Sequence, residues 1–457
     1  MQQTFPPRGS GIEGRQESAP SETWGHPWQL DPSVWTWKPG RILLGVWPTD
    51  NATWKVGIDD DRHIATIAGS RGGKTRTSLI PNLLVYPGSV IVIDPKGELV
   101  SATASARAAM GQNVHVLDPF GITGVPTASY NPLADLGEGE HEVAPNAAQL
   151  ADALIIDAEK ETHWTAAARN LVRGITLHLL STAEIVPTLA DLRNALCGDQ
   201  LALEELFIDM QTSKAFGGIV SRIGSSFLGK FRTSEREFQE ILSSAQEQTA
   251  PLDDILGSSG ASHFSLKDLK RRPTTVYLVL PGTRMATHHR WLRLIIQQAV
   301  AAMEAVPTDR GKPPVLCVLE EFAALGHMRS IEVAAGYMAG FGLRLWIVLQ
   351  DIGQLKALYK NSWETFLGNA GIIQALAVAD AGTAEYLSQA MGNAMVLERQ
   401  GVRVSASAMS NGDIGQREQW RHVRLLEPAE LRRHFSRETG RQLILSPGRP
   451  PIYLNRM

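Results

Sequence analysis

The stretch from residue 63 to residue 94 constrains the fold more than any other part of the chain. An apolar run, Ile64 to Ile67, leads into a glycine-rich loop that ends in Gly73-Lys74-Thr75, and an apolar helical pattern follows through Leu84. Strand, glycine-rich loop and helix in this order form the context of a phosphate-binding loop, or P-loop. The sequence therefore predicts a nucleotide site at this point.

The residue types of this loop fit phosphate chemistry. Successive backbone N–H groups can cradle phosphate oxygens, and the helix N-terminus adds its positive dipole end. Lys74 would reach the β- and γ-phosphates of ATP, and the Thr75 hydroxyl would bind Mg²⁺. The strict pattern has Gly where this chain has Ala68, which leaves an ordinary tight turn as the other reading. The predicted nucleotide-binding residues are Gly69, Ser70, Arg71, Gly72, Gly73, Lys74, Thr75 and Arg76.

Composition places the chain among large globular proteins. It has 457 residues, of which 43% are hydrophobic, and a formal net charge of −3, so the whole molecule is not a basic nucleic-acid-binding surface. From Arg399 onward there are eleven Arg against five Asp or Glu, which would suit nucleic acid, anionic lipid or a solvated surface. No apolar run approaches the ~18 residues of a membrane span. We expect a cytoplasmic protein, with peripheral attachment to the inner membrane through a partner left open.

Apolar runs that end in acidic residues alternate with helical patterns over residues 57–136 and 270–457. This pattern is typical of an α/β fold with a mostly parallel sheet. Ala394 to Leu397 is expected to add a strand to that sheet. Residues 137–269 carry long amphipathic helical patterns and are expected to form an inserted all-helical domain. The Trp-rich arm over residues 1–56 would clamp onto the core or, alternatively, dock a partner.

Hydrolysis needs a second strand that is followed by acidic residues, and the sequence predicts one. The apolar run Val315 to Leu319 is followed by Glu320 and Glu321. Glu320 would hold Mg²⁺ together with Thr75, and Glu321 would accept the proton of the attacking water. Gln350, after another apolar run, would sense the γ-phosphate or orient the water, or simply cap a helix. Asp94 and Asp118 end strands as well, and could face the phosphates, a partner subunit or a helix N-terminus.

The chain resembles the type IV coupling proteins, the TraG/TraD family of conjugative DNA transfer and type IV secretion ATPases. The resemblance runs from about Gly57 to Met391 and rests on many short segments in order. These segments are the P-loop, Ile80-Pro81-Asn82-Leu83, Asp94 to Glu98, Asn131-Pro132-Leu133, Trp164 to Arg169, Glu235-Arg236, Ile241 to Gln246, Arg271 to Tyr277, Glu320 to Gly326, Gln350 to Leu355 and Thr383 to Leu387.

The resemblance implies a RecA-like motor domain carrying an all-helical domain. It implies ATP and Mg²⁺ as ligands, a hexameric ring, and transport of relaxase-bound single-stranded DNA or effector proteins to a type IV secretion channel. Ring ATPases often complete the site with an arginine from the neighbouring subunit, for which Arg344 and Arg399 are the candidates. Many members carry N-terminal membrane helices, and this sequence shows none.

Two other functions fit parts of the sequence. The first is a hexameric DNA translocase of the FtsK type or a helicase, against which the helical insert with Trp164 to Arg169 argues. The second is a receptor or adaptor that binds nucleotide with little turnover, which Ala68 and Glu320 keep open because both depart from the usual pattern.

Overall fold

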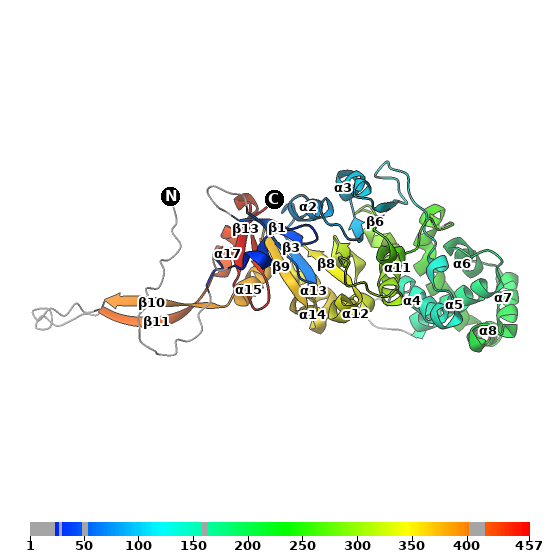
Figure 1. Cartoon of the computed structure of the whole chain (residues 1–457). Helices are drawn as coiled ribbons and strands as arrows, with labels where there is room; N and C mark the ends of the chain where they lie inside the picture. The colour runs from blue at the N-terminus through cyan, green and yellow to red at the C-terminus, as the bar shows by residue number, and fades with distance from the viewer. Residues whose placement is uncertain (1–22, 27–29, 48–53, 158–162, 259, 402–415) are drawn as a thin grey trace, which may run out of the picture.

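A large sheet forms the centre of the molecule (Figure 1). The computed structural model describes residues 23–26, 30–47, 54–157, 163–258, 260–401 and 416–457, with only the backbone given at 399–401 and 416–418. In these residues eleven strands form one sheet in the order β2-β1-β13-β12-β9-β3-β8-β7-β4-β6-β5. Its strands are β1 Ile42–Trp47, β2 Trp54–Ile58, β3 His63–Ala68, β4 Val90–Asp94, β5 Asn113–Leu117, β6 Thr274–Val279, β7 Val315–Leu319, β8 Leu343–Leu349, β9 Ala370–Leu376, β12 Arg441–Leu445 and β13 Ile452–Asn455.

The run of strands from β9 to β5 is parallel throughout. Strands β3, β4, β7, β8 and β9 are buried along their whole length. Their near-continuous apolar sequences follow from this burial, because helices cover both faces of a parallel sheet. The other edge, β12-β13-β1-β2, is antiparallel. The α/β class and the mostly parallel sheet expected from the sequence are confirmed.

The described part of the Trp-rich arm packs onto the body of the protein. β1 and β2 lie at or near the end of this arm and join the edge of the sheet. Trp35 and Trp47 are buried, and the ring of Trp24 lies against Phe435 and Tyr453. Trp24, Trp35 and Trp47 therefore serve packing, which is the first of the two roles expected for the arm. Trp28 lies outside the described residues.

Helices cover the sheet and form a separate layer at one of its ends (Figure 1). The stretch from α4 to α9 contains helices and no described strand, and α4 packs against α11 of the sheet region. The limits of the helical domain remain a prediction. The helices are α1 Pro32–Trp35, α2 Ile80–Leu83, α3 Glu98–Ala109, α4 Glu140–Leu154, α5 His163–Thr182, α6 Leu189–Leu196, α7 Gln200–Thr212, α8 Ala215–Thr233, α9 Glu235–Thr249, α10 Asp268–Arg271, α11 Met285–Ala305, α12 Arg329–Tyr337, α13 Ile352–Tyr359, α14 Trp363–Gly368, α15 Ala381–Ala390 and α17 Pro428–His434.

The segment Ala394 to Leu397 does form a strand, but it does not join the main sheet. It lies in β10 Asn393–Gly401, which pairs in antiparallel register with β11 Gln416–Arg424. This hairpin projects from one end of the molecule, and the helical layer from α4 to α9 lies at the other end (Figure 1). The expected extra strand of the main sheet was therefore wrong. Both partners of the pair lie close in sequence, so β10 finds its hydrogen bonds locally.

Two buried polar side chains fix the helix that follows the P-loop. The Asn82 amide accepts from the Leu43 N–H and donates to the Leu43 carbonyl, which ties α2 to β1. The Arg107 guanidinium donates to the carbonyls of Leu83 and Tyr86 at the end of α2. Burial lowers the pKa of Arg107 to about 10. Because buried polar groups are costly without partners, these bonds hold the helix in one place.

Candidate functional site

The glycine-rich loop begins directly after β3 and packs tightly against a neighbouring loop. A Cβ on Gly69 would lie 2.5 Å from the carbonyl oxygen of Ala377, and a Cβ on Gly72 would lie 2.8 Å from the Cβ of Ala377. Gly73 has φ +91°, in the region that favours glycine. These three glycines are required by the backbone path. Ala68 is the last residue of β3 and is fully buried, so the departure from the strict pattern falls on the strand.

The turn of helix after the loop is wider than a regular α-helix. Thr75 to Leu79 form a π-helical segment in which the Ile80 N–H bonds to the Thr75 carbonyl. Pro81 follows at the start of α2 and has no N–H to donate. Such π segments are common at functional sites. The expected helix through Leu84 is therefore present, with a wide first turn beside the loop.

Three neighbouring parallel strands bring the predicted site residues together. β8 lies between β3 and β7 in the sheet, so the loop after β3, the two glutamates after β7 and Gln350 after β8 share one edge. Lys74 Nζ lies 2.8 Å from Glu321 Oε1, and Gln350 Nε2 donates to Glu321 Oε2 at 3.2 Å. Thr75 Oγ1 donates to Glu320 Oε1 at 2.8 Å. Lys74 and Glu321, which are 247 positions apart in the sequence, thus belong to one polar cluster.

Glu321 sits in an unusual backbone conformation at the centre of this cluster. Its φ is +57°, in the left-handed region, which costs a non-glycine residue about 1–2 kcal/mol. Burial acts to raise the pKa of Glu321, but the hydrogen bond and charge of Lys74 and the bond from Gln350 outweigh it. The pKa is therefore held below its usual value. Glu321 is a charged carboxylate in this arrangement.

Glu320 is the more buried of the two acids and behaves in the opposite way. Glu320 is 7% exposed, and this burial raises its pKa to about 7. The hydrogen bond from Thr75 and the charge of Lys74 oppose the rise. The charges of Asp94 and Glu321 raise it further. The hydroxyl of Thr75 and the carboxylate of Glu320 are hard oxygen donors of the kind that Mg²⁺ prefers. The residues present therefore fit a magnesium ion.

The remaining predicted residues fall into two groups. Ser70, Arg71 and Arg76 are exposed, with Arg71 at φ +56° on the loop. Their phosphate contacts remain predictions. Arg344 lies inside β8 and is only 2% exposed, so it cannot reach a neighbouring subunit, and its candidacy as a trans arginine was wrong. The side chain of Arg399 lies outside the described residues.

The strand-end acids Asp94 and Asp118 bond to their own loops. Asp94 accepts from the backbone N–H groups of Lys96 and Val100 at the start of α3. Asp118 accepts from the backbone N–H and the hydroxyl of Thr123. Among the alternatives left open for Asp94, the helix-capping one fits. Asp118 stabilises a turn.

The chain also matches a known protein family over most of its length. Residues 29–457 match the family described as "Type IV secretory system Conjugative DNA transfer". The chain belongs to this family. The resemblance noted from the sequence to type IV coupling proteins is thereby confirmed.

Curated relatives in this family have modest sequence identity and are longer. Protein VirD4 of Rhizobium radiobacter is 26% identical over 400 residues, which span 86% of this chain and 56% of the relative. Conjugal transfer protein TraG of Escherichia coli is 27% identical over 427 residues, which span 86% of this chain and 66% of the relative. The chain therefore spans less than two thirds of the length of these relatives.

Solved structures of another coupling protein share the fold. Plasmid coupling protein TrwB in complex with a non-hydrolysable ATP analogue superposes with a TM-score of 0.70 at 14% identity, covering 96% of both chains. TrwB in complex with ADP and Mg²⁺ gives 0.63 at 15% identity, covering 91% of this chain and 94% of TrwB. These likenesses establish the RecA-like α/β fold. Among the described residues, no helix has the length and apolar character needed to cross a membrane.

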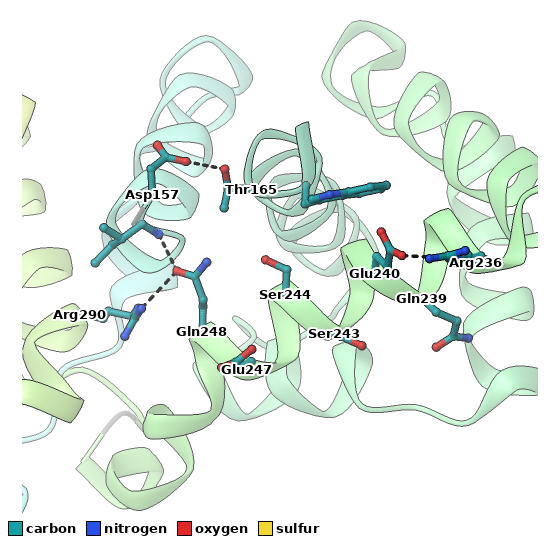
Figure 2. A pocket seen from close by; sticks show the side chains of 12 residues that line it. Asp157, Thr165, Arg236, Gln239, Glu240, Ser243, Ser244, Glu247, Gln248 and Arg290 are labelled. Atoms are coloured by element: carbon teal, nitrogen blue, oxygen red, sulfur yellow. Dashed lines mark hydrogen bonds and ion pairs between the residues drawn. The ribbon is translucent and has the colours of Figure 1, made fainter. Parts of the chain in front are cut away.

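A pocket in the helical layer is lined by residues from the segments Trp164 to Arg169 and Ile241 to Gln246, which carry the resemblance noted from the sequence. The pocket has a volume of about 850 Å³ and lies between the start of α5, the face of α9 and the start of α11 (Figure 2). Trp164 is 36% exposed and lines the pocket together with Arg236 and Glu240. Gln248 accepts from Arg290 at the other end. The pocket contains no P-loop residue, so it is a separate feature of the surface.

Three residues beside the P-loop and Gln350 were not predicted as site residues from the sequence. Gln354 accepts from the Gln350 N–H, Ala377 packs on Gly69 and Gly72, and Arg456 donates to the Gly72 carbonyl. Gln354 follows Gln350 by one helical turn, and this spacing was a usable signal. No local pattern marks Ala377 or Arg456.

Proposed function

We propose that the protein is an ATP-hydrolysing coupling protein of a type IV secretion or conjugation system. The observation that carries the proposal is the meeting of Lys74 and Thr75 with Glu320, Glu321 and Gln350 at one edge of the sheet. A P-loop beside a strand-end carboxylate pair is the arrangement used for phosphoryl transfer to water. TrwB has been solved with an ATP analogue and with ADP and Mg²⁺, which supports the same ligands here.

The ion pair between Lys74 and Glu321 suggests how nucleotide arrival readies the site. A γ-phosphate in the loop competes with Glu321 for the Lys74 ammonium. As Lys74 turns to the phosphate, Glu321 loses the partner that holds its pKa low, so its basicity rises towards that of a useful general base. Gln350, already bonded to Glu321, is placed to orient the attacking water. Binding and base activation are coupled through one lysine.

Thr75 and Glu320 would hold Mg²⁺ beside the phosphates. The ion, when bound, neutralises charge that develops on the phosphoryl oxygens. The role of this chain is to present two oxygen donors already adjacent, with Glu320 kept in place by the Thr75 hydroxyl. Glu320 has one methylene more than the usual Asp, and its direct contact with Thr75 shows that the longer side chain reaches this point.

Membership of the family supports a proposal for assembly and cargo. We infer a hexameric ring in which a neighbouring subunit supplies an arginine to the nucleotide, because ring ATPases often complete the site in this way. Cargo would be relaxase-bound single-stranded DNA or effector proteins, delivered to the secretion channel from the cytoplasm, with a partner holding the protein at the inner membrane. The pocket beside Trp164 is a surface on which cargo could be recognised, since an exposed aromatic ring and arginines suit a single strand.

A steady-state ATPase assay without DNA, with single-stranded DNA and with double-stranded DNA tests the function. The proposal expects Mg²⁺-dependent turnover that rises when DNA is added. Nucleotide binding without turnover under either condition would make the protein a nucleotide-binding adaptor. Turnover stimulated by double-stranded DNA alone would favour a translocase of the FtsK type.

A further inference from the structure

The peptide between Gly72 and Gly73 is anchored from a distant part of the chain. Arg456 follows β13 directly, and its Nη1 donates to the Gly72 carbonyl at 3.1 Å across 384 positions of sequence. The same guanidinium donates to the carbonyls of Ser436 at 2.9 Å, Arg437 at 3.2 Å and Arg441 at 3.0 Å. It is half-buried and spans four carbonyl oxygens, so it is held rigidly itself.

The need for an anchor comes from the two glycines. A peptide flanked by Gly on both sides rotates at little steric cost, because neither residue has a Cβ to restrict φ and ψ. The carbonyl of Gly73 is fixed locally, since the Thr77 N–H donates to it at 2.8 Å and the Thr77 hydroxyl at 3.0 Å. The carbonyl of Gly72 lies one peptide earlier and is fixed by Arg456 instead.

The direction of the carbonyl decides the direction of the next amide. In a trans peptide the C=O and the following N–H point to opposite sides. With the Gly72 carbonyl turned to Arg456, the Gly73 N–H points away from Arg456. The N–H of Gly72 itself is engaged by the Gly69 carbonyl at 2.9 Å. The Gly73 N–H is therefore the donor whose direction depends on Arg456.

We propose that Arg456 is a positioning residue of the nucleotide site, which holds the Gly72–Gly73 peptide so that the Gly73 N–H faces the phosphates. Arg456 acts through the loop and does not touch the nucleotide. This inference rests on the proposed nucleotide site. It makes the segment from Ser436 to Arg456 part of the P-loop support, although this segment carries no phosphate-binding sequence pattern.

The test compares nucleotide affinity in Arg456→Ala, Arg456→Lys and wild-type protein by titration with Mg²⁺·ADP. Arg456→Ala should weaken affinity about ten-fold, the effect of losing one charge-assisted hydrogen bond that orders the site. The nucleotide affinity of Arg456→Lys should lie between those of Arg456→Ala and the wild type, because one ammonium cannot bond to all the carbonyls that the guanidinium joins. Arg449→Ala is the matched control, since Arg449 lies in the same segment with its guanidinium over the Trp35 ring.

Chemical rescue separates positioning from general loss of structure. Guanidinium chloride, at concentrations far below those that unfold proteins, should restore affinity to Arg456→Ala and leave Arg449→Ala unchanged, while equal NaCl should restore nothing. If Arg456→Ala does not fold by circular dichroism, Arg456→Lys carries the test through its own affinity. Wild-type affinity in a folded Arg456 variant would overturn the inference. Absence of nucleotide binding in the wild-type protein would instead overturn the proposed function.

Discussion

The replacement Glu320→Gln should stabilise the nucleotide-free protein in a pH-dependent way. Glu320 is buried beside Asp94 and Glu321, and its pKa is raised from 4.5 to about 7. A carboxyl whose pKa is raised by folding binds more protons in the folded state. Its burial therefore costs little below the unfolded pKa, costs more as pH rises from 4.5 to 7, and costs its full amount above 7. Gln removes this cost while its amide oxygen can still accept from Thr75.

The size of the effect follows from the pKa. A shift of about 2.5 units corresponds to about 3 kcal/mol at pH 8, and to under about 1 kcal/mol at pH 5. At an unfolding entropy of about 2 cal/mol/K per residue, a chain of 457 residues changes its melting temperature by about 1 °C per kcal/mol. Glu320→Gln should thus raise the melting temperature by about 3 °C at pH 8 and by under about 1 °C at pH 5.

The assay is thermal unfolding at both pH values with EDTA and without nucleotide. Glu321→Gln is the matched control one residue away. Its carboxylate has a lowered pKa because of Lys74, so its removal loses an ion pair and should leave stability at pH 8 unchanged or lower. An equal shift for Glu320→Gln at both pH values, or no shift at all, would refute the assignment of Glu320 as a buried carboxyl with a raised pKa.

Three further predictions concern the proposed function. Lys74→Ala should weaken ATP binding by at least about ten-fold in a titration while its circular dichroism melt stays cooperative, because a charge-assisted phosphate contact is lost; wild-type affinity would remove Lys74 from the site. Single-stranded DNA should bind without sequence preference, and its affinity should fall steeply as the salt concentration is raised in a fluorescence anisotropy titration. The reason is that neutralised phosphates release counterions. An affinity that does not depend on salt would favour protein cargo. Turnover per subunit should rise with protein concentration as rings form. It is measured across about a hundredfold range of concentration, alongside light scattering. Turnover per subunit that stays constant while the protein remains monomeric would contradict the ring mechanism.

Local features of this protein were readable from the sequence. The P-loop, the strand ending in Glu320 and Glu321, and the strand ending in Gln350 each depend on residues next to one another. Parallel strands place their carboxyl ends on one edge, so the general location of the cluster could be predicted. The pairing of Lys74 with Glu321 could not, because it depends on which strands become neighbours in the folded sheet.

The failures of the sequence reasoning have physical causes. Arg344 was a candidate for the arginine supplied by a neighbouring subunit, but β8 lies in the interior of the sheet and buries the residue. Ala394 to Leu397 has strand character, and its partner β11 is a local one outside the main sheet. Arg456 contacts the P-loop only because β13 returns to the sheet edge beside β12 and β1. Contacts of this kind depend on the topology, which is not encoded in any single stretch.

The measurement that tests the account most directly is ATP turnover of Glu321→Gln beside that of the wild-type protein, with single-stranded DNA present. The variant keeps the P-loop and Glu320. It loses the carboxylate that would accept the water's proton and, with it, the ion pair to Lys74. The account predicts ATP affinity no weaker than that of the wild type, because Lys74 is released from Glu321, and turnover reduced by at least about a hundredfold. Unchanged turnover with unchanged affinity would show that Glu321 is not the general base and would contradict the proposed mechanism.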